Sequence, residues 1–201
     1  MMVFNLQKKI EKPKLSDYFL RGIVLYAFLV FVFQDELVNA VSTAFIFLLM
    51  TIPVLVKRKY KTRTPLELDI ALSVFVFLSL YLGSLRGYYD RFPWYDLMLH
   101  FSSGMLLGLI GFVLLYLLNQ NSPENVNLSP GFISFFAFSF SMTMSAIWEI
   151  FEFAMDLFFG FNMQKSGLID TMSDLIVNTA GALIVAIGGY IWIKQRGKTF
   201  F

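Results

Sequence analysis

Six long apolar runs, separated by short polar stretches, predict six membrane-spanning helices in this chain. A spanning helix needs about 20 mostly apolar residues, and the runs come close to that length. The predicted helices are residues 19–33, 37–56, 66–85, 96–118, 131–153 and 174–193, with the fifth ending somewhere between 150 and 159. The pattern predicts an all-α, polytopic membrane protein in which residues 1–201 form a single transmembrane domain.

Two of the predicted helices carry capping signals at their starts. Thr64 to Glu67 has the residues of a capping box, with proline at the first helical position. Ser129 followed by Pro130 has the same character ahead of the fifth helix. Residues 34–36, between the first two helices, are expected to form a solvated turn, and residues 119–130 a polar loop.

The composition supports a membrane protein. Hydrophobic residues make up 57% of the chain and charged residues only 15%, against about 45–50% and about 25% in soluble domains. The mean hydropathy is +0.67. There is no cysteine, which excludes disulfides, thiolate metal sites and cysteine nucleophiles. We therefore expect the lipid bilayer as the surroundings and no nucleic-acid partner.

Lysine and arginine predict the orientation. With six spans, 13 of these residues fall on one side, and the positive-inside rule then places both termini in the cytoplasm. These 13 are Lys8, Lys9, Lys12, Lys14, Arg21, Lys57, Arg58, Lys59, Lys61, Arg63, Lys194, Arg196 and Lys198. The outer side receives Arg86, Arg91 and Lys165. It also receives the aromatic residues of 88–95, which we expect to form an interfacial belt.

The same orientation gathers acidic residues at the outer ends of the helices, where they outnumber the bases nine to three. The nine are Asp35, Glu36, Asp90, Asp96, Glu149, Glu152, Asp156, Asp170 and Asp174. Pairing with three basic residues cannot neutralise all of them. The remaining acids must face water, be protonated or hold a cation.

Helical spacing aligns several of these acids. At about 100° per residue, Glu149, Glu152 and Asp156 fall within a stripe about 60° wide. Asp96 and His100, four residues apart, are neighbours on one helix face. Asp170, Asp174 and Asn178 repeat that spacing. The last three helices are therefore predicted to present polar groups from their outer ends.

Small residues continue these stripes inward, and such residues allow membrane helices to approach closely. They are Ser103, Gly104, Gly108, Gly111, Ser134, Ser141, Ser145, Gly181 and Gly188. We infer that the last three helices pack together, with the acids meeting at the outer end of their interface.

Plainer interpretations exist for several of these residues. Asp96 and Asp170 are each placed to cap a helix start, where a carboxylate meets free N–H groups. Asp156 is placed to lie in the outer loop. Arg86 and Arg91 are interpreted either as interfacial anchors or as contacts to a lipid headgroup. A lone histidine such as His100 usually packs with a hydrogen bond, and Trp148 is interpreted as interfacial packing.

Three segments resemble the YjdF-like family of prokaryotic inner-membrane proteins and, more distantly, VanZ-like proteins. The segments are DLMLHFSSGMLLG (96–108), WEIFEFAMD (148–156) and GLIDTMSDLIVNTAGALIVAIGG (167–189). The positions that match the family pattern are Asp96, His100, Glu149, Glu152, Asp170, Asp174, Asn178 and Gly181. The resemblance covers the last three predicted helices. It implies a multi-pass protein of the prokaryotic plasma membrane, with a cell-envelope connection through the VanZ-like proteins.

The favoured function is a divalent-cation site that serves chemistry on a lipid or envelope substrate. Carboxylates with one imidazole suit Mg²⁺, Mn²⁺ or Zn²⁺. The expected ligands or acid–base groups are Asp96, His100, Glu149, Glu152 and Asp174, of which His100, Glu149 and Glu152 are the catalytic candidates. Asp156, Asp170 and Asn178 are further site candidates, and Arg86 and Arg91 are candidates for binding a headgroup.

Two alternatives stay open. Acids and a histidine inside a membrane are common in proton relays and cation pathways, which would make the protein a transporter. A non-catalytic scaffold with a structural polar network, or with a docking surface for a partner, fits the same residues. The sequence leaves open whether the protein is an enzyme, what its substrate is and how many copies assemble.

Overall fold

The computed structural model describes residues 15–60, 66–121 and 128–196. Every regular element within these ranges is helical, which confirms the all-α prediction. In chain order they are α1 (Leu15–Phe33), α2 (Leu37–Tyr60), α3 (Leu66–Val76), the π-helical segment η1 (Phe77–Leu85), α4 (Tyr88–Arg91), α5 (Tyr95–Asn121), α6 (Pro130–Phe159) and α7 (Leu168–Arg196).

Four helical stretches are long and apolar enough to cross a membrane. They are Glu67–Leu85, Tyr95–Leu115, Pro130–Phe159 and Leu168–Gln195. The apolar parts of the first two helices, Tyr18–Phe33 and Leu37–Ile52, are shorter. The polytopic character is thus supported by four spans, while the count of six and the orientation of the termini stay predictions.

The chain separates into two compact units, Met1–Tyr95 and Asp96–Phe201. In the first, α1 and α2 form a hairpin around a buried core of Val24, Ile46 and Met50. The expected turn is present between them, and Asp35 adopts a left-handed backbone with φ 58°. Arg21 donates a hydrogen bond from Nη2 to the carbonyl oxygen of Met50 at 2.7 Å.

The predicted third helix changes from α-helical to π-helical hydrogen bonding about halfway along its length. From Phe77 it continues as η1, which ends with a hydrogen bond from the Arg86 N–H to the Tyr81 carbonyl at 3.0 Å. The short helix α4, which was not predicted, follows Gly87 at φ 71°. The aromatic residues of 88–95 pack on one another, with Tyr88 edge-on to both Phe92 and Tyr95.

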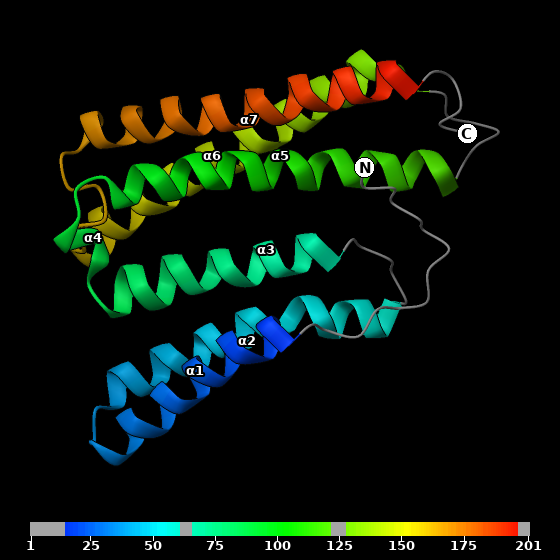
Figure 1. Cartoon of the computed structure of the whole chain (residues 1–201). Helices are drawn as coiled ribbons and strands as arrows, with labels where there is room; N and C mark the ends of the chain where they lie inside the picture. The colour runs from blue at the N-terminus through cyan, green and yellow to red at the C-terminus, as the bar shows by residue number, and fades with distance from the viewer. Residues whose placement is uncertain (1–14, 61–65, 122–127, 197–201) are drawn as a thin grey trace. The chain divides into compact units, whose positions relative to one another are not determined.

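In the second unit, α5, α6 and α7 lie side by side (Figure 1). A Cβ added at Gly104 would overlap the carbonyl oxygen of Asn178, and one at Gly181 would overlap that of Phe101. Ser141 on α6 donates a hydrogen bond to the Gly104 carbonyl at 3.0 Å. The prediction that small residues bring these helices together is confirmed at these positions.

One small residue was assigned to the wrong position. A Cβ at Gly188 would meet nothing within 4 Å, whereas one at Gly189 would come within 2.7 Å of the Phe112 ring. The helical face that α7 turns toward α5 is therefore shifted by one residue near its C-terminal end. An apolar cluster of Leu115, Ile133 and Ile193 closes that end.

The helix ends decide where the acids lie. Ser129 caps α6 as predicted, since its hydroxyl accepts a hydrogen bond from the Phe132 N–H at 3.2 Å. The helix α6 continues to Phe159, at the far limit of the expected range of 150–159, whereas α7 begins at Leu168 instead of 174. Asp156 and Asp170 consequently both lie in terminal helical turns. The capping box that starts at Thr64 and the middle of the predicted loop at 122–127 fall outside the described residues.

Candidate metal centre

The chemically interesting side chains all come from one end of the second unit. Two lie in the first turns of α5, two near the end of α6 and three in the first turns of α7. They are Asp96, His100, Glu149, Glu152, Asp170, Asp174 and Asn178. The close approach of the three helices at their glycines brings these groups together. The predicted convergence on a shared interface is therefore present in the fold.

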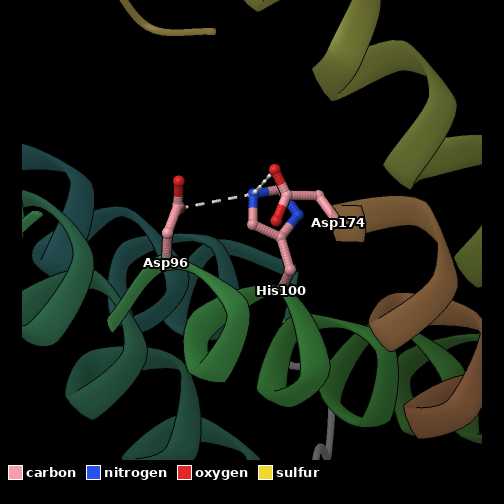
Figure 2. A group of neighbouring side chains, drawn as sticks. All are labelled: Asp96, His100 and Asp174. Atoms are coloured by element: carbon pink, nitrogen blue, oxygen red, sulfur yellow. Dashed lines mark ion pairs between the residues drawn. The ribbon is translucent and has the colours of Figure 1, made fainter. Parts of the chain in front are cut away.

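His100 stands at the centre of the group. Its Nε2 lies 3.6 Å from Asp96 Oδ1 and 3.8 Å from Asp174 Oδ2, and Figure 2 shows both carboxylates turned toward the ring. Its Nδ1 lies 3.7 Å from Glu149 Oε1. These separations exceed hydrogen-bond length, which is about 2.7–3.2 Å for N–H···O. Each ring nitrogen thus faces carboxylate oxygen with a gap between them.

The acids are buried and have few partners. Glu149 is 5% exposed and Asp174 only 2%. Neither oxygen of Glu149, nor Oδ2 of Asp174 or of Asp170, has a hydrogen-bond partner in the described part of the chain, although the Thr171 side chain approaches Glu149. Buried polar atoms in folded proteins nearly always have partners, and leaving one unpaired costs about 1–3 kcal/mol. These orphaned oxygens are what a bound ligand would satisfy.

Asn178 on α7 connects the site to α5 through hydrogen bonds. Its Nδ2 donates to Ser103 Oγ at 3.0 Å and to the His100 carbonyl oxygen at 3.4 Å. Ser103 in turn donates to the same carbonyl at 2.8 Å. The amide therefore holds α7 against the turn that carries His100. This contact gives Asn178 a positioning role at the floor of the group.

Trp148 has a role that sequence reasoning missed. Its indole Nε1 donates to Glu152 Oε1 at 2.8 Å and so fixes one oxygen of that carboxylate. The signal was available in principle, because residues 148 and 152 have the i, i+4 spacing of neighbours on a helix face. The ring itself is 43% exposed, which also agrees with the interfacial packing expected of it.

Asp156 has a structural role in the connection between α6 and α7. Its two carboxylate oxygens accept hydrogen bonds from the Met163 and Gln164 N–H groups at 2.7 and 2.8 Å. Gln164 Nε2 then donates to Thr171 Oγ1 at 2.6 Å. Asp156 therefore organises the connection between α6 and α7 and is absent from the residue groups suited to a cation in the described chain.

The two arginines expected at a headgroup belong to the other compact unit. Arg86 lies at the C-terminal end of η1, and Arg91 is the last residue of α4. Because they belong to Met1–Tyr95, their part in ligand binding stays a prediction.

Two sets of three residues have the arrangement of a cation site. They are Asp96, His100 and Asp174, and His100, Glu149 and Glu152; within each set the ligand atoms lie within 4.8 Å of one another. Ligand atoms about 2.1 Å from a common ion are about 3.0–3.4 Å apart in octahedral or tetrahedral geometry. The separations of 3.6–3.8 Å around His100 are a few tenths of an ångström longer. Small side-chain rotations would close that difference.

Comparison with known proteins identifies the family to which this chain belongs. A family model described as "Predicted membrane protein (DUF2238)" matches residues 17–195, nearly the whole chain. This is the family of YjdF-like proteins, so that resemblance is confirmed, whereas no match extends to VanZ-like proteins. Neither curated proteins nor solved structures give a significant match.

Proposed function

The chain belongs to the DUF2238 family of predicted membrane proteins, and we propose that it binds a divalent cation between α5, α6 and α7. The ligands of this cation are His100 through Nε2, Asp96 and Asp174. Glu149 and Glu152 face the same space and serve as acid–base groups. We further propose that the protein resides in the prokaryotic plasma membrane, where the cation assists chemistry on a lipid or envelope substrate.

One observation carries this proposal. His100 Nε2 lies within 4 Å of carboxylates from two helices, while Asp174 Oδ2 is buried and unpaired. A structural polar network would be expected to close such gaps with hydrogen bonds, because an unsatisfied buried acceptor destabilises the fold. A cation would remove this energetic cost, because it would bind an oxygen of Asp96, an oxygen of Asp174 and the ring nitrogen of His100 at once.

The donor set favours a borderline or hard cation. Imidazole suits Zn²⁺ among the common ions, and carboxylates suit Zn²⁺, Mn²⁺ and Mg²⁺. Three protein ligands leave a coordination position for water or substrate, as in catalytic zinc sites. A cation held this way can polarise a phosphoryl or carbonyl oxygen or activate a bound water.

Asp96 is the most exposed of the three proposed ligands. The Asp96 side chain is 25% exposed, whereas those of His100 and Asp174 are 9% and 2% exposed. A substrate would therefore approach the cation past Asp96. This position at the end of three apolar helices suits a reactive group carried at the membrane surface, such as a lipid headgroup.

The test is cation binding to purified protein. After metal removal and dialysis against Zn²⁺, Mn²⁺ or Mg²⁺, the wild type should retain bound cation measured by elemental analysis, and Asp174→Asn should retain one equivalent fewer. Asp35→Asn is the matched control, because Asp35 is exposed in the α1–α2 turn and asparagine tolerates its left-handed backbone. It should bind as the wild type does. Absence of bound cation in the wild type with all three ions would refute the proposal.

A further inference from the structure

The charge at this end of the second unit exceeds what one divalent cation balances. Five carboxylates gather there: Asp96, Glu149, Glu152, Asp170 and Asp174. Lys165, in the α6–α7 connection, lies within electrostatic reach of Asp96 and Asp170. With ionised carboxylates and a neutral histidine, five negative charges, one lysine and one divalent cation leave a net charge of −2. A second divalent cation brings the sum to zero, or to −1 once the histidine ring loses its proton, so two cations balance the charge more closely than one.

The geometry offers a second position on the other side of the histidine ring. His100 Nδ1 faces Glu149 Oε1 at 3.7 Å, and Glu152 completes a set whose ligand atoms lie within 4.8 Å of one another. Glu149 is 5% exposed and Glu152 8%. This set shares only the imidazole with the first set, and it contacts that ring through the opposite nitrogen.

Two further observations indicate a ligand at this second position. Neither buried oxygen of Glu149 has a partner at hydrogen-bond distance in the described chain, although the Thr171 side chain approaches this carboxylate, and Oε1 lies 3.7 Å from His100 Nδ1. Trp148 holds Glu152 through a 2.8 Å hydrogen bond. Residues that orient a metal ligand in this way are common around metal sites. The hydrogen bond therefore orients Glu152 before any cation binds, while Glu149 is approached only by the Thr171 side chain and the His100 ring.

We propose that the site is dinuclear, with His100 bridging two divalent cations: one bound by Nε2, Asp96 and Asp174, and one bound by Nδ1, Glu149 and Glu152. This inference rests on the proposed function, since it adds a second ion to the first. Each ion has three protein ligands and an open position, the arrangement of catalytic zinc. It reassigns Glu149 and Glu152 from acid–base groups to ligands.

Bridging has a chemical requirement that can be measured. A neutral imidazole carries a proton on one nitrogen, so binding metal at both nitrogens displaces that proton to solvent. Metal binding is generally coupled to such proton release. The requirement favours Zn²⁺, which binds imidazole well, over Mg²⁺, which prefers oxygen ligands.

The experiment is a Zn²⁺ titration of the full-length, metal-free protein in detergent. Calorimetry gives the stoichiometry, and Trp148 emission reports on the position that contains Glu152. The wild type should bind two equivalents with a change in emission. Asp174→Asn should bind one and keep the emission change, whereas Glu152→Gln should bind one and lose it. Trp148→Phe should bind the second equivalent about 10–100-fold more weakly and without the emission change, which assigns the signal to that ring.

Repeating the titration in buffers of different ionisation enthalpy should reveal release of the ring proton with the second equivalent. One equivalent in the wild type, abolished by Asp174→Asn and unaffected by Glu152→Gln, would overturn the dinuclear site and leave the single-cation proposal standing. In that case Nδ1–H simply donates to Glu149. No bound Zn²⁺ in any of these proteins would overturn the dinuclear site, and the absence of bound Mn²⁺ and Mg²⁺ as well would overturn both proposals.

Discussion

Replacing Asp174 with asparagine separates a cation site from a structural network, because the two interpretations predict opposite changes in stability. Asp174 is 2% exposed, and its Oδ2 has no hydrogen-bond partner among the described residues. If the Asp174 carboxylate is a cation ligand, it has no partner when the cation is absent. Asparagine then replaces an unpaired buried acceptor or negative charge. Without metal, the free energy of unfolding should then stay the same or rise by up to about 3 kcal/mol.

Adding cation should stabilise the wild type relative to Asp174→Asn. A ligand at 100 times its dissociation constant stabilises the folded state by about 2.7 kcal/mol per site. The wild type should gain that amount from the Nε2 position, and Asp174→Asn should not. For a chain of this size, the difference corresponds to about 5–11 °C in Tm.

The assay is thermal unfolding in detergent, followed by tryptophan emission, with chelator and then with Zn²⁺. Asp35→Asn again serves as the control and should follow the wild type in both conditions. Removing one member of a satisfied buried ionic network would instead lower stability by about 3–5 kcal/mol. Such a fall in chelator, together with equal responses of both proteins to Zn²⁺, would refute the cation-site reasoning.

Four further substitutions test the packing and the loop. Gly181→Ala should destabilise the fold by about 1–3 kcal/mol in the same unfolding assay, because the new Cβ overlaps a backbone carbonyl, whereas Gly188→Ala, with open space around it, should be neutral or slightly stabilising. Ser141→Ala should cost about 1 kcal/mol through its lost interhelical hydrogen bond; no change would mean that the bond is unimportant. Asp156→Asn should accelerate amide hydrogen exchange at Gln164, measured by mass spectrometry, since its second oxygen is lost as an acceptor; unchanged exchange would show that the loop holds without it.

The core of the candidate site could be predicted from spacing alone. The i, i+4 relation placed Asp96 beside His100, and the stripe on the fifth predicted helix placed Glu149 and Glu152 on one face. Their convergence followed from glycine and serine positions, because such residues determine which faces of membrane helices can approach. Gly104 and Gly181 make those contacts in the structure.

The features that sequence missed depend on contacts between segments or on backbone geometry. The residues of η1 are mostly apolar, and such a run carries no signal for a change from α to π hydrogen bonding. Asp156 lies on the same stripe as Glu149, yet its oxygens bind N–H groups of a loop whose path depends on Gly160 and Gly167 at φ 68° and 61°. Spacing predicts which face a side chain occupies, but it does not predict the partner that the following loop supplies.

The structure also bears on the choice between a binding site and a transport pathway. A relay would need polar steps or space on the inward side of His100. There, the backbone of α7 at Asn178 touches α5 at Gly104, and Gly181 lies against the carbonyl of Phe101. Ser141 of α6 closes the third side by bonding to the Gly104 carbonyl. These contacts hold the three helices together directly beneath the carboxylates, and this is why we favour a site that binds and acts over one that conducts.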